Sequence, residues 1–264
     1  MPAILGARLL LALLLLAEPT YQTWTLASRS TGDTRTINVY LPPGYDSLPA
    51  RAYPVLYMPD GGMQEDFPHV TVTVDSLIRL GRIPPMLVVG VENTQRRRDM
   101  TGPTRFREDS AIAPKVSGSA AFRAFFRDEL MPEVGRRYRV TGATAIVGES
   151  LAGLFIVETF LVEPALFDRA IALDPSLWWN GEALVDSATT LLAQAGGRPR
   201  VLYLASSNEE GIAVPTARLA ALLGQAGGPT VTWSYAPRPD LTHGTIYIGV
   251  VAEALVRVLG TGGF

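Results

Sequence analysis

Short apolar segments alternate with longer segments of helical length along most of this chain. Residues 36–41 alternate polar and apolar side chains, which is typical of a strand with one face exposed. Residues 54–58 and 86–91 are short apolar runs, as strands buried on both faces are. The second half continues the alternation, with strands expected at Thr144–Gly148, Arg169–Leu173, Arg200–Ala205 and Thr230–Ala236. Strands that alternate with helices predict an α/β fold, a mostly parallel sheet covered by helices on both faces.

Helices are expected between these strands. They are Ala120–Arg137, a helix from Leu151, one from about Glu182, Val214–Ala226 and Thr245–Leu259. In the first of them, aromatic side chains recur near helical spacing, which indicates packing in the core. Residues 70–80 are ambiguous, because valines and threonines alternate while the end of the segment is helical in pattern. Residues 93–117 are charged without a clear period and predict a long loop, a kind of segment that is usually functional or mobile.

The amino-terminal segment has the layout of a secretory signal. Arg8 precedes an unbroken apolar run from Leu9 to Leu16, and Ala17 offers a small residue before a cleavage site. The run is shorter than the roughly 20 residues of a membrane span. We therefore expect a signal peptide over residues 1–18, one α/β domain over residues 19–264, and a periplasmic or secreted bacterial protein. An uncleaved anchor and a misassigned start codon are the alternatives.

Composition narrows the chemistry. The chain has 264 residues, no cysteine, two histidines and a formal net charge of −2. The absence of cysteine excludes disulfides, thiolate catalysis and cysteine metal sites, and two histidines argue against a histidine-rich metal site. The small net charge gives no indication of a nucleic-acid partner. We expect no cofactor, no metal and no stable membrane insertion after removal of the signal, and the oligomeric state stays open.

Ser150 stands in the segment Gly148-Glu149-Ser150-Leu151-Ala152-Gly153, where an apolar strand gives way to a helix. A serine on such a sharp turn is held in a strained backbone, with its hydroxyl above the edge of the sheet. The positive end of the following helix faces any negative charge that develops there. The arrangement predicts a nucleophile that attacks an ester carbonyl. The pattern Gly-x-Ser-x-Gly is imperfect here, because Ala152 takes the place of the last glycine.

His243 is the expected base. An activated serine needs a base within hydrogen-bond reach and a carboxylate that orients the base. Sites in open parallel sheets gather at the carboxyl ends of strands, and Ser150, Glu209 and His243 each follow such an end. Their order along the chain is serine, acid, histidine, which is the order of hydrolase triads on α/β sheets. His69 precedes Ser150 and breaks this order, so we expect it to line the substrate pocket or to have a structural role.

Glu209 is the expected acid, because it directly follows the turn at the end of its strand. Glu210 would point elsewhere but stays an alternative, and Asp240 is a third candidate because it is close to His243 in sequence. Asp174 follows a different strand, and there we expect a residue that forms the turn.

Two backbone N–H groups are needed to bind the oxyanion of an ester-cleavage intermediate. Leu151, the residue after the expected nucleophile, supplies one of them. The other is expected from Gly61 or Gly62, in the loop that follows the strand at residues 54–58. Glycines there let the backbone approach the substrate oxygen closely, although a plain turn is the alternative.

Three side chains are candidates for substrate contacts. Arg97, in a run of three arginines, could bind an anionic substrate, although such a run is usually a solvated face. Trp178 and Trp179 follow a strand end and could form an aromatic wall for an acyl or aryl group, with simple packing as the alternative.

Several stretches jointly give the chain its resemblance to the putative-esterase family of α/β-hydrolases, which includes esterase D-like enzymes, siderophore trilactone esterases, feruloyl esterases and mycolyltransferases. The siderophore-esterase branch is the most similar. The stretches span nearly the whole chain after the leader, and they are Tyr53–Gly62, Val89–Thr94 with Arg98–Thr101, Gly148–Gly153, Pro175–Trp179 and Thr242–Gly244.

The resemblance implies an α/β-hydrolase fold with Ser150 as nucleophile, His243 as base and the Asp60–Met63 loop as part of the oxyanion hole. The chain departs from the family at Ala152, where the family usually has glycine, and some siderophore esterases work with a serine–histidine pair. The expected function is a serine carboxylic-ester hydrolase that forms an acyl-enzyme with a soluble ester, such as a siderophore trilactone or an aryl or feruloyl ester. An acyltransferase with the same triad and a catalytically inactive binding protein are the alternatives.

Overall fold

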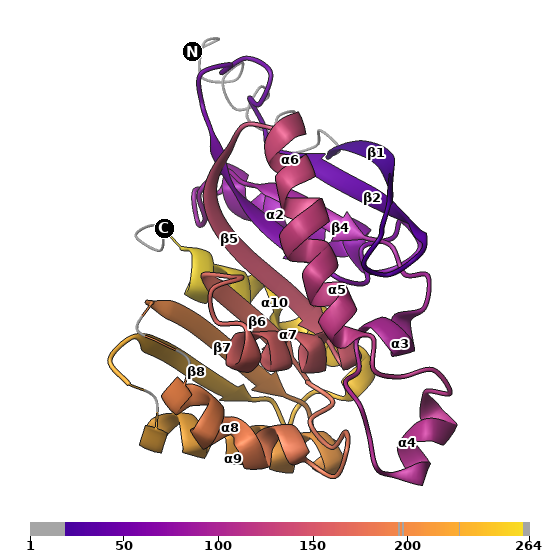
Figure 1. The fold of residues 1–264 in the computed structure, drawn as a ribbon. Helices are drawn as coiled ribbons and strands as arrows, with labels where there is room; N and C mark the ends of the chain where they lie inside the picture. The colour runs from indigo at the N-terminus through magenta and orange to yellow at the C-terminus, as the bar shows by residue number, and fades with distance from the viewer. Residues whose placement is uncertain (1–18, 195, 197, 227, 261–264) are drawn as a thin grey trace, which may run out of the picture.

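An eight-stranded sheet forms the centre of the computed structural model, which describes residues 19–194, 196, 198–226 and 228–260 (Figure 1). The strand order is β1-β2-β4-β3-β5-β6-β7-β8. All neighbouring pairs from β4 to β8 are parallel, whereas β1 and β2 form an antiparallel hairpin, and β2 is antiparallel to β4. The strands are β1 (Thr20–Ala27), β2 (Thr34–Leu41), β3 (Tyr53–Met58), β4 (Leu87–Val91), β5 (Val140–Glu149), β6 (Arg169–Leu173), β7 (Arg200–Ser206) and β8 (Val231–Pro237).

Helices cover both faces of this sheet (Figure 1). The helical elements are α2 (Phe67–Arg79), α3 (Arg96–Asp99), α4 (Arg107–Ile112), α5 (Ser119–Phe125), the π-helical turn η1 (Phe126–Leu130), α6 (Met131–Arg137), α7 (Leu151–Val162), α8 (Ala183–Gln194), α9 (Glu210–Ala226) and α10 (His243–Leu259). The predicted mostly parallel sheet with helices on both sides is therefore confirmed.

The core has two halves, one on each face of the sheet. Ile146 of β5 packs into the half that contains Phe126 and Phe155, from η1 and α7. The next residue, Val147, packs into the half built with α2 and α10. Successive strand residues point to opposite faces, so a central strand that is covered on both sides must be apolar throughout. This requirement is the physical reason that short apolar runs indicated the strands correctly.

Three local features of the fold could be assigned only from the tertiary structure. The ambiguous segment at residues 70–80 belongs to helix α2, whose buried side chains follow helical spacing. Residues 93–117 are not one irregular loop, because they contain the short helices α3 and α4. Strand β1 was not predicted; it lies at the edge of the sheet and pairs only with β2, so its side chains are exposed or half-buried.

The predicted signal peptide, residues 1–18, lies outside the described residues. Within the part of the chain that the structure describes, no helix has the length and apolar character needed to cross a membrane.

Candidate active site

Ser150 occupies the sharp turn between β5 and α7 that the sequence predicts. Its backbone has φ 60° and ψ −120°, a conformation that non-glycine residues rarely adopt. Strand β6 holds this turn: the N–H of Ser150 donates to the carbonyl of Leu173 at 3.0 Å, and the N–H of Ser176 donates to the carbonyl of Ser150 at 3.0 Å. The strained backbone thus places the hydroxyl at the amino-terminal end of α7.

Close packing around this turn explains the departure from Gly-x-Ser-x-Gly. A Cβ atom on Gly148 would come within 2.7 Å of the Cβ of Ala152, so a side chain fits at only one of these two positions. A Cβ atom on Gly153 would lie 3.0 Å from the Cα of Pro175. In this chain the close approach of α7 to the segment after β6 therefore occurs at Gly153, one position after the usual glycine.

His243 is the first residue of α10, and its Nε2 lies 3.1 Å from the Oγ of Ser150. Two backbone hydrogen bonds, of 2.7 and 2.9 Å, join the loop before His243 to the last residue of β7 and to the segment after it. A capping box formed by Thr242 and Thr245 holds the first turn of α10. The structure thus brings the expected nucleophile and the expected base together, although 93 positions separate them.

Asp174, and not Glu209, is the carboxylate that forms a hydrogen bond with the histidine ring. Its Oδ2 lies 2.6 Å from the Nδ1 of His243. The side chain of Asp174 is fully buried, and Ser207 donates its N–H to Oδ1 at 2.6 Å and its hydroxyl to Oδ2 at 2.8 Å. The expectation that Glu209 orients the ring is therefore wrong.

The other acids considered from the sequence make no hydrogen bond or ion pair with the ring among the described residues. Glu209 and Glu210 are exposed at the start of α9, and Asp240 forms a two-point ion pair with Arg238, at 2.9 and 2.7 Å. Asp174 does form a turn, with φ 46°, as expected. The missed feature was its position directly after the strand that neighbours β5.

The electrostatic environment favours a charged ring on His243. Its hydrogen bond to Asp174 is the largest influence and raises the pKa of the imidazole above its ordinary value, although burial opposes this change. The negative charges of Glu149, Asp174 and Glu209 add to the rise. A base with a raised pKa holds a proton more firmly once it has taken one, which is what general-base catalysis requires.

Three N–H groups were expected to bind the oxyanion, and among the described residues only one of them is without a hydrogen bond. Leu151 is the first residue of α7, and its N–H makes no hydrogen bond within the described residues. The N–H of Gly61 donates to the carbonyl of Val91 at 2.9 Å, so the expectation that Gly61 binds the oxyanion is wrong. The N–H of Gly62 donates to the Oε2 of Glu65 at 2.7 Å, and it becomes free only if this side chain moves aside.

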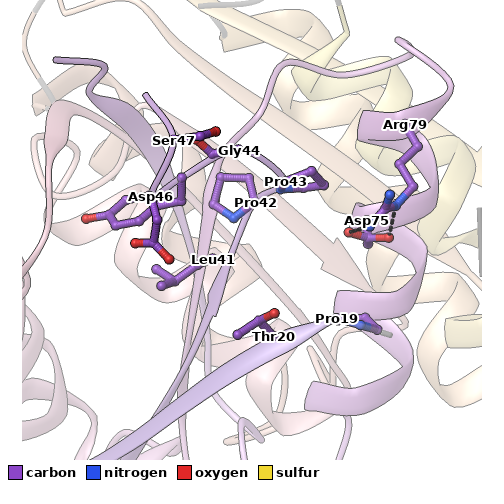
Figure 2. A pocket seen from close by; sticks show the side chains of 11 residues that line it. Pro19, Thr20, Leu41, Pro42, Pro43, Gly44, Asp46, Ser47, Asp75 and Arg79 are labelled. Atoms are coloured by element: carbon purple, nitrogen blue, oxygen red, sulfur yellow. Dashed lines mark hydrogen bonds and ion pairs between the residues drawn. The ribbon is translucent and has the colours of Figure 1, made fainter. Parts of the chain in front are cut away.

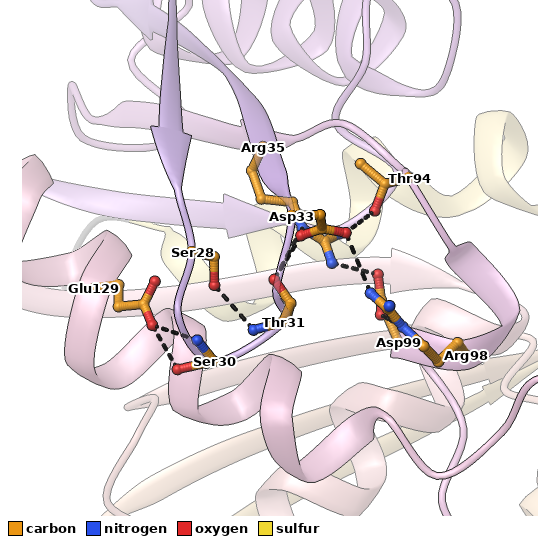
Figure 3. A network of polar contacts seen from close by, with 9 residues as sticks. All are labelled: Ser28, Ser30, Thr31, Asp33, Arg35, Thr94, Arg98, Asp99 and Glu129. Carbon is orange, nitrogen blue, oxygen red and sulfur yellow. Dashed lines mark hydrogen bonds and ion pairs between the residues drawn. The ribbon is translucent and has the colours of Figure 1, made fainter.

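Two of the three consecutive arginines pair with carboxylates inside the protein. Arg96 holds Asp60, directly after β3, with hydrogen bonds of 2.6 and 2.8 Å. Arg98 bonds to Asp99 at 2.7 Å and to Asp33 at 3.2 Å (Figure 3). These pairs fasten α3 both to the loop after β3 and to the β1–β2 hairpin.

Arg35 is part of the network in Figure 3. Its side chain is buried, and it pairs with Asp33 and with Asp99, each at 2.7 Å. The guanidinium also lies over the ring of Phe122, 5.3 Å from the ring centroid. A buried charge is tolerated because carboxylates neutralise it, so the network ties β2 firmly to α3.

Arg97 remains as the candidate for substrate binding. Its side chain is exposed, donates to the carbonyl of Ile112, and forms no ion pair within the described residues. With Lys115 it borders a pocket of about 380 Å³. A basic group that no carboxylate neutralises can attract an anionic ligand.

The two tryptophans differ in exposure. Trp179 is only 4% exposed, and its indole N–H donates to the carbonyl of Gly102 at 3.1 Å. The exposed surface of Trp179 is therefore small, and the side chain holds the segment at residues 102–104 in place. Trp178 is half-buried, and its ring lies 6.0 Å from that of Trp179. It is the more exposed of the two side chains.

His69 lies on α2, where it packs edge-on against Tyr247 of α10 with ring centroids 4.7 Å apart. Burial lowers the pKa of its imidazole. The Nδ1 atom lies 3.7 Å from a carboxylate oxygen of Asp66, and no contact joins His69 to Ser150. A neutral, packed ring of this kind fits the structural role that the sequence left open.

A pocket of about 290 Å³ lies away from this site, between the Pro42–Ser47 turn and α2 (Figure 2). Asp75 and Arg79, which form an ion pair of 2.6 Å, stand on its wall. Ser150 follows the carboxyl end of β5, which runs in the same direction as β4. Because β2 is antiparallel to β4, the carboxyl end of β2 at Leu41 lies at the opposite ends of these strands, away from Ser150. This pocket therefore cannot present a ligand to the serine.

A solved structure with a similar fold is the IroE-like serine hydrolase from Shewanella oneidensis. It is 24% identical, the match covers 91% of this chain and 80% of that one, and the TM-score is 0.82. At this identity the likeness concerns the fold alone. Together with the strand order, it confirms the α/β-hydrolase fold.

Two relatives are named as siderophore esterases. The ferri-bacillibactin esterase BesA of Bacillus subtilis is 30% identical over 171 residues, 57% of this chain and 57% of that protein. The siderophore enterobactin esterase of Emericella nidulans is 32% identical over 91 residues, 33% of this chain and 30% of that protein. Each match therefore spans less than two thirds of the relative's length. The family described as putative esterase matches residues 28–213, so this chain belongs to the putative-esterase family.

Proposed function

We propose that this chain is a serine esterase that hydrolyses soluble carboxylic esters through an acyl-enzyme. The observation that carries the proposal is the unbroken series of contacts from Ser150 through His243 to Asp174, with distances of 3.1 and 2.6 Å. A serine, a histidine and a buried carboxylate in this geometry make the hydroxyl a nucleophile. Membership of the putative-esterase family supports the same chemistry.

The acylation step begins with attack of the Ser150 Oγ on the carbonyl carbon. As the Oγ–C bond forms, the hydroxyl proton moves to the Nε2 of His243. Asp174 accepts a hydrogen bond from Nδ1–H and stabilises the imidazolium. The tetrahedral intermediate then collapses, and the alcohol leaves with the proton that Nε2 donates. A water molecule repeats the sequence on the acyl-enzyme and releases the acid.

The negative oxygen of the intermediate requires N–H donors. We assign one to Leu151, whose N–H is open at the start of α7. The second is the N–H of Gly62, after the carboxylate of Glu65 has moved away from it. Loss of a single such donor typically slows acyl transfer by about 10²–10³-fold.

We infer the substrate class from the named relatives and from a basic surface on and beside α3. BesA is a ferri-bacillibactin esterase and the Emericella protein is an enterobactin esterase. Arg97 and Lys115 border an open pocket, and Arg97 has no internal ion-pair partner among the described residues. We therefore favour siderophore trilactones, or aryl and feruloyl esters, over long neutral acyl chains. Trp178 supplies an aromatic surface that would pack against an aryl group.

A hydrolysis panel tests this proposal. It contains p-nitrophenyl acetate, methyl ferulate, a catecholate trilactone and a long-chain acyl ester, each assayed with the wild-type chain and with Ser150→Ala. We expect activity on the short, aryl or trilactone esters, loss of several orders of magnitude in the variant, and labelling of Ser150 by a fluorophosphonate. If no ester is cleaved, or if Ser150→Ala retains a substantial part of the activity, the proposal is wrong.

We also propose that the protein is exported, on the strength of the apolar run from Leu9 to Leu16 that follows Arg8. Expression of the full chain in a bacterium, followed by fractionation and mass measurement, tests export. A full-length product retained in the cytoplasm contradicts it.

A further inference from the structure

Glu149, the residue directly before the nucleophile, lies beside the catalytic histidine. Its Oε1 is 3.9 Å from the Nδ1 of His243, the same nitrogen that bonds to Asp174. The side chain is 18% exposed, and Oε1 is buried without a hydrogen-bond partner among the described residues. A buried carboxylate oxygen that lacks a hydrogen bond is costly, and the nearest cationic group that can compensate for it is the imidazolium of His243.

The charge of Glu149 depends on pH in the neutral range. Burial raises the pKa of its carboxyl to about 7, and the negative charges of Asp66 and Asp174 add to this rise. The positive charges of His243 and Arg96 oppose it. These four groups come from α10, α3, the loop before α2 and the segment after β6, so the local charge is set by tertiary structure and not by β5 alone.

We propose that Glu149 is a positioning residue, a second carboxylate that stabilises the charged form of His243 through space while Asp174 holds the ring by a hydrogen bond. This inference rests on the proposed esterase function. The proton balance of the reaction is unchanged: the proton of Ser150 moves to Nε2 and then to the leaving oxygen, and Glu149 takes no proton from the substrate. Its contribution is the negative charge that faces the imidazolium while this cation exists.

Glutamine at position 149 removes the charge and keeps the shape, so it separates electrostatic support from packing. An opposite charge within about 4–6 Å shifts a pKa by about 1–3 units, and partial exposure brings this site to the lower end. In Glu149→Gln we therefore expect the pKa of His243 to fall by about one unit. Glu149→Asp keeps the charge on a shorter side chain and should give a smaller fall.

Histidine NMR measures this effect without any substrate. The chain has only two histidines, so an untagged protein shows two imidazole titrations. The titration of His243 should move to lower pH in Glu149→Gln, while that of His69 stays nearly unchanged. Glu133→Gln, a change of the same kind on α6, is the matched control and should move neither. An unmoved or raised His243 titration in folded Glu149→Gln would overturn the inference, whatever the substrate proves to be.

The pH profile of kcat/KM provides the second readout. Activity falls at low pH as His243 becomes protonated, so a lower pKa moves this acid limb to lower pH. We expect Glu149→Gln to shift the acid limb of kcat/KM to lower pH and to lower its plateau several-fold. A loss that is equal at every pH, with an unmoved limb, would indicate a packing role and refute the inference. An NMR shift in a chain that cleaves no ester would refute the esterase proposal but leave the charge pairing established.

Discussion

Replacing Asp174 with asparagine tests whether the catalytic acid is Asp174, which the structure places at the ring of His243, or Glu209. Asp174 is fully buried, and its Oδ2 lies 2.6 Å from the Nδ1 of His243. Asparagine has nearly the same shape, and its Oδ1 can still accept the N–H of Ser207. Its amide NH₂ then faces Nδ1 and donates to it, so the ring carries its proton on Nε2. In that tautomer Nε2 cannot accept the proton of Ser150.

The expected loss is therefore large. The corresponding change in serine proteases lowers kcat on the order of 10⁴-fold, which corresponds to about 5.4 kcal/mol of transition-state stabilisation. Glu209→Gln should cost no more than about threefold, because the side chain is exposed and influences His243 only through its charge. The hydrogen bond to Asp174 is the main cause of the raised pKa of His243. Its loss lowers this pKa, so the acid limb of any residual activity should move to lower pH.

The assay is steady-state hydrolysis of p-nitrophenyl acetate over a range of pH, with thermal unfolding as the check on folding. Folded Asp174→Asn protein with activity within tenfold of the wild type would refute the assignment of the acid. If Glu209→Gln were the more damaging change, the expectation from sequence would be right and the geometry misleading. If neither change mattered, the enzyme would work with a serine–histidine pair.

Four further changes test other parts of the structure. His243→Ala should abolish hydrolysis, whereas His69→Ala should retain turnover and mainly lower thermal stability; the reverse order of activities would contradict the choice of base. Arg97→Gln should lower kcat/KM several-fold for an anionic ester at low salt but not for a neutral one, and the difference should disappear near 0.5 M salt. Arg136→Gln on α6 is its control, and equal effects of the two changes would exclude a substrate contact. Arg35→Met removes the cation from a buried network and should reduce the free energy of unfolding by about 3 kcal/mol in urea titration; an unchanged midpoint would show that the network does not stabilise the fold.

Local pattern alone identified much of the molecule. The central strands are buried on both faces, so their apolar runs were visible in the sequence. The Gly148–Gly153 segment marked the strand-to-helix turn at Ser150, because close packing against β6 and backbone strain restrict which residues fit there. With only two histidines in the chain, strand-end position and chain order were enough to choose His243 as the partner of the serine.

The acid was decided by the order of strands in the sheet, which the sequence does not state. Acidic residues follow several strand ends, and each was a reasonable candidate. In the structure β6 lies beside β5, so Asp174 is one strand away from Ser150, whereas Glu209 follows β7, two strands away. The burial of Asp174 and its hydrogen bonds from Ser207 then fix its carboxylate against the ring of His243.

The same reason explains the other corrections. The arginine run at residues 96–98 was a candidate for anion binding, with a solvated face as the alternative. In the structure, carboxylates 36 and 65 positions earlier in the chain pair with Arg96 and Arg98, and Arg98 also pairs with Asp99. The N–H of Gly61 was assigned to a substrate oxygen, but the carbonyl of Val91, on the neighbouring strand, accepts it. The sequence determines which groups can pair, because it sets their charge and hydrogen-bonding capacity. Which groups do pair depends on strand order and register, and these are decided by how both faces of the sheet pack together.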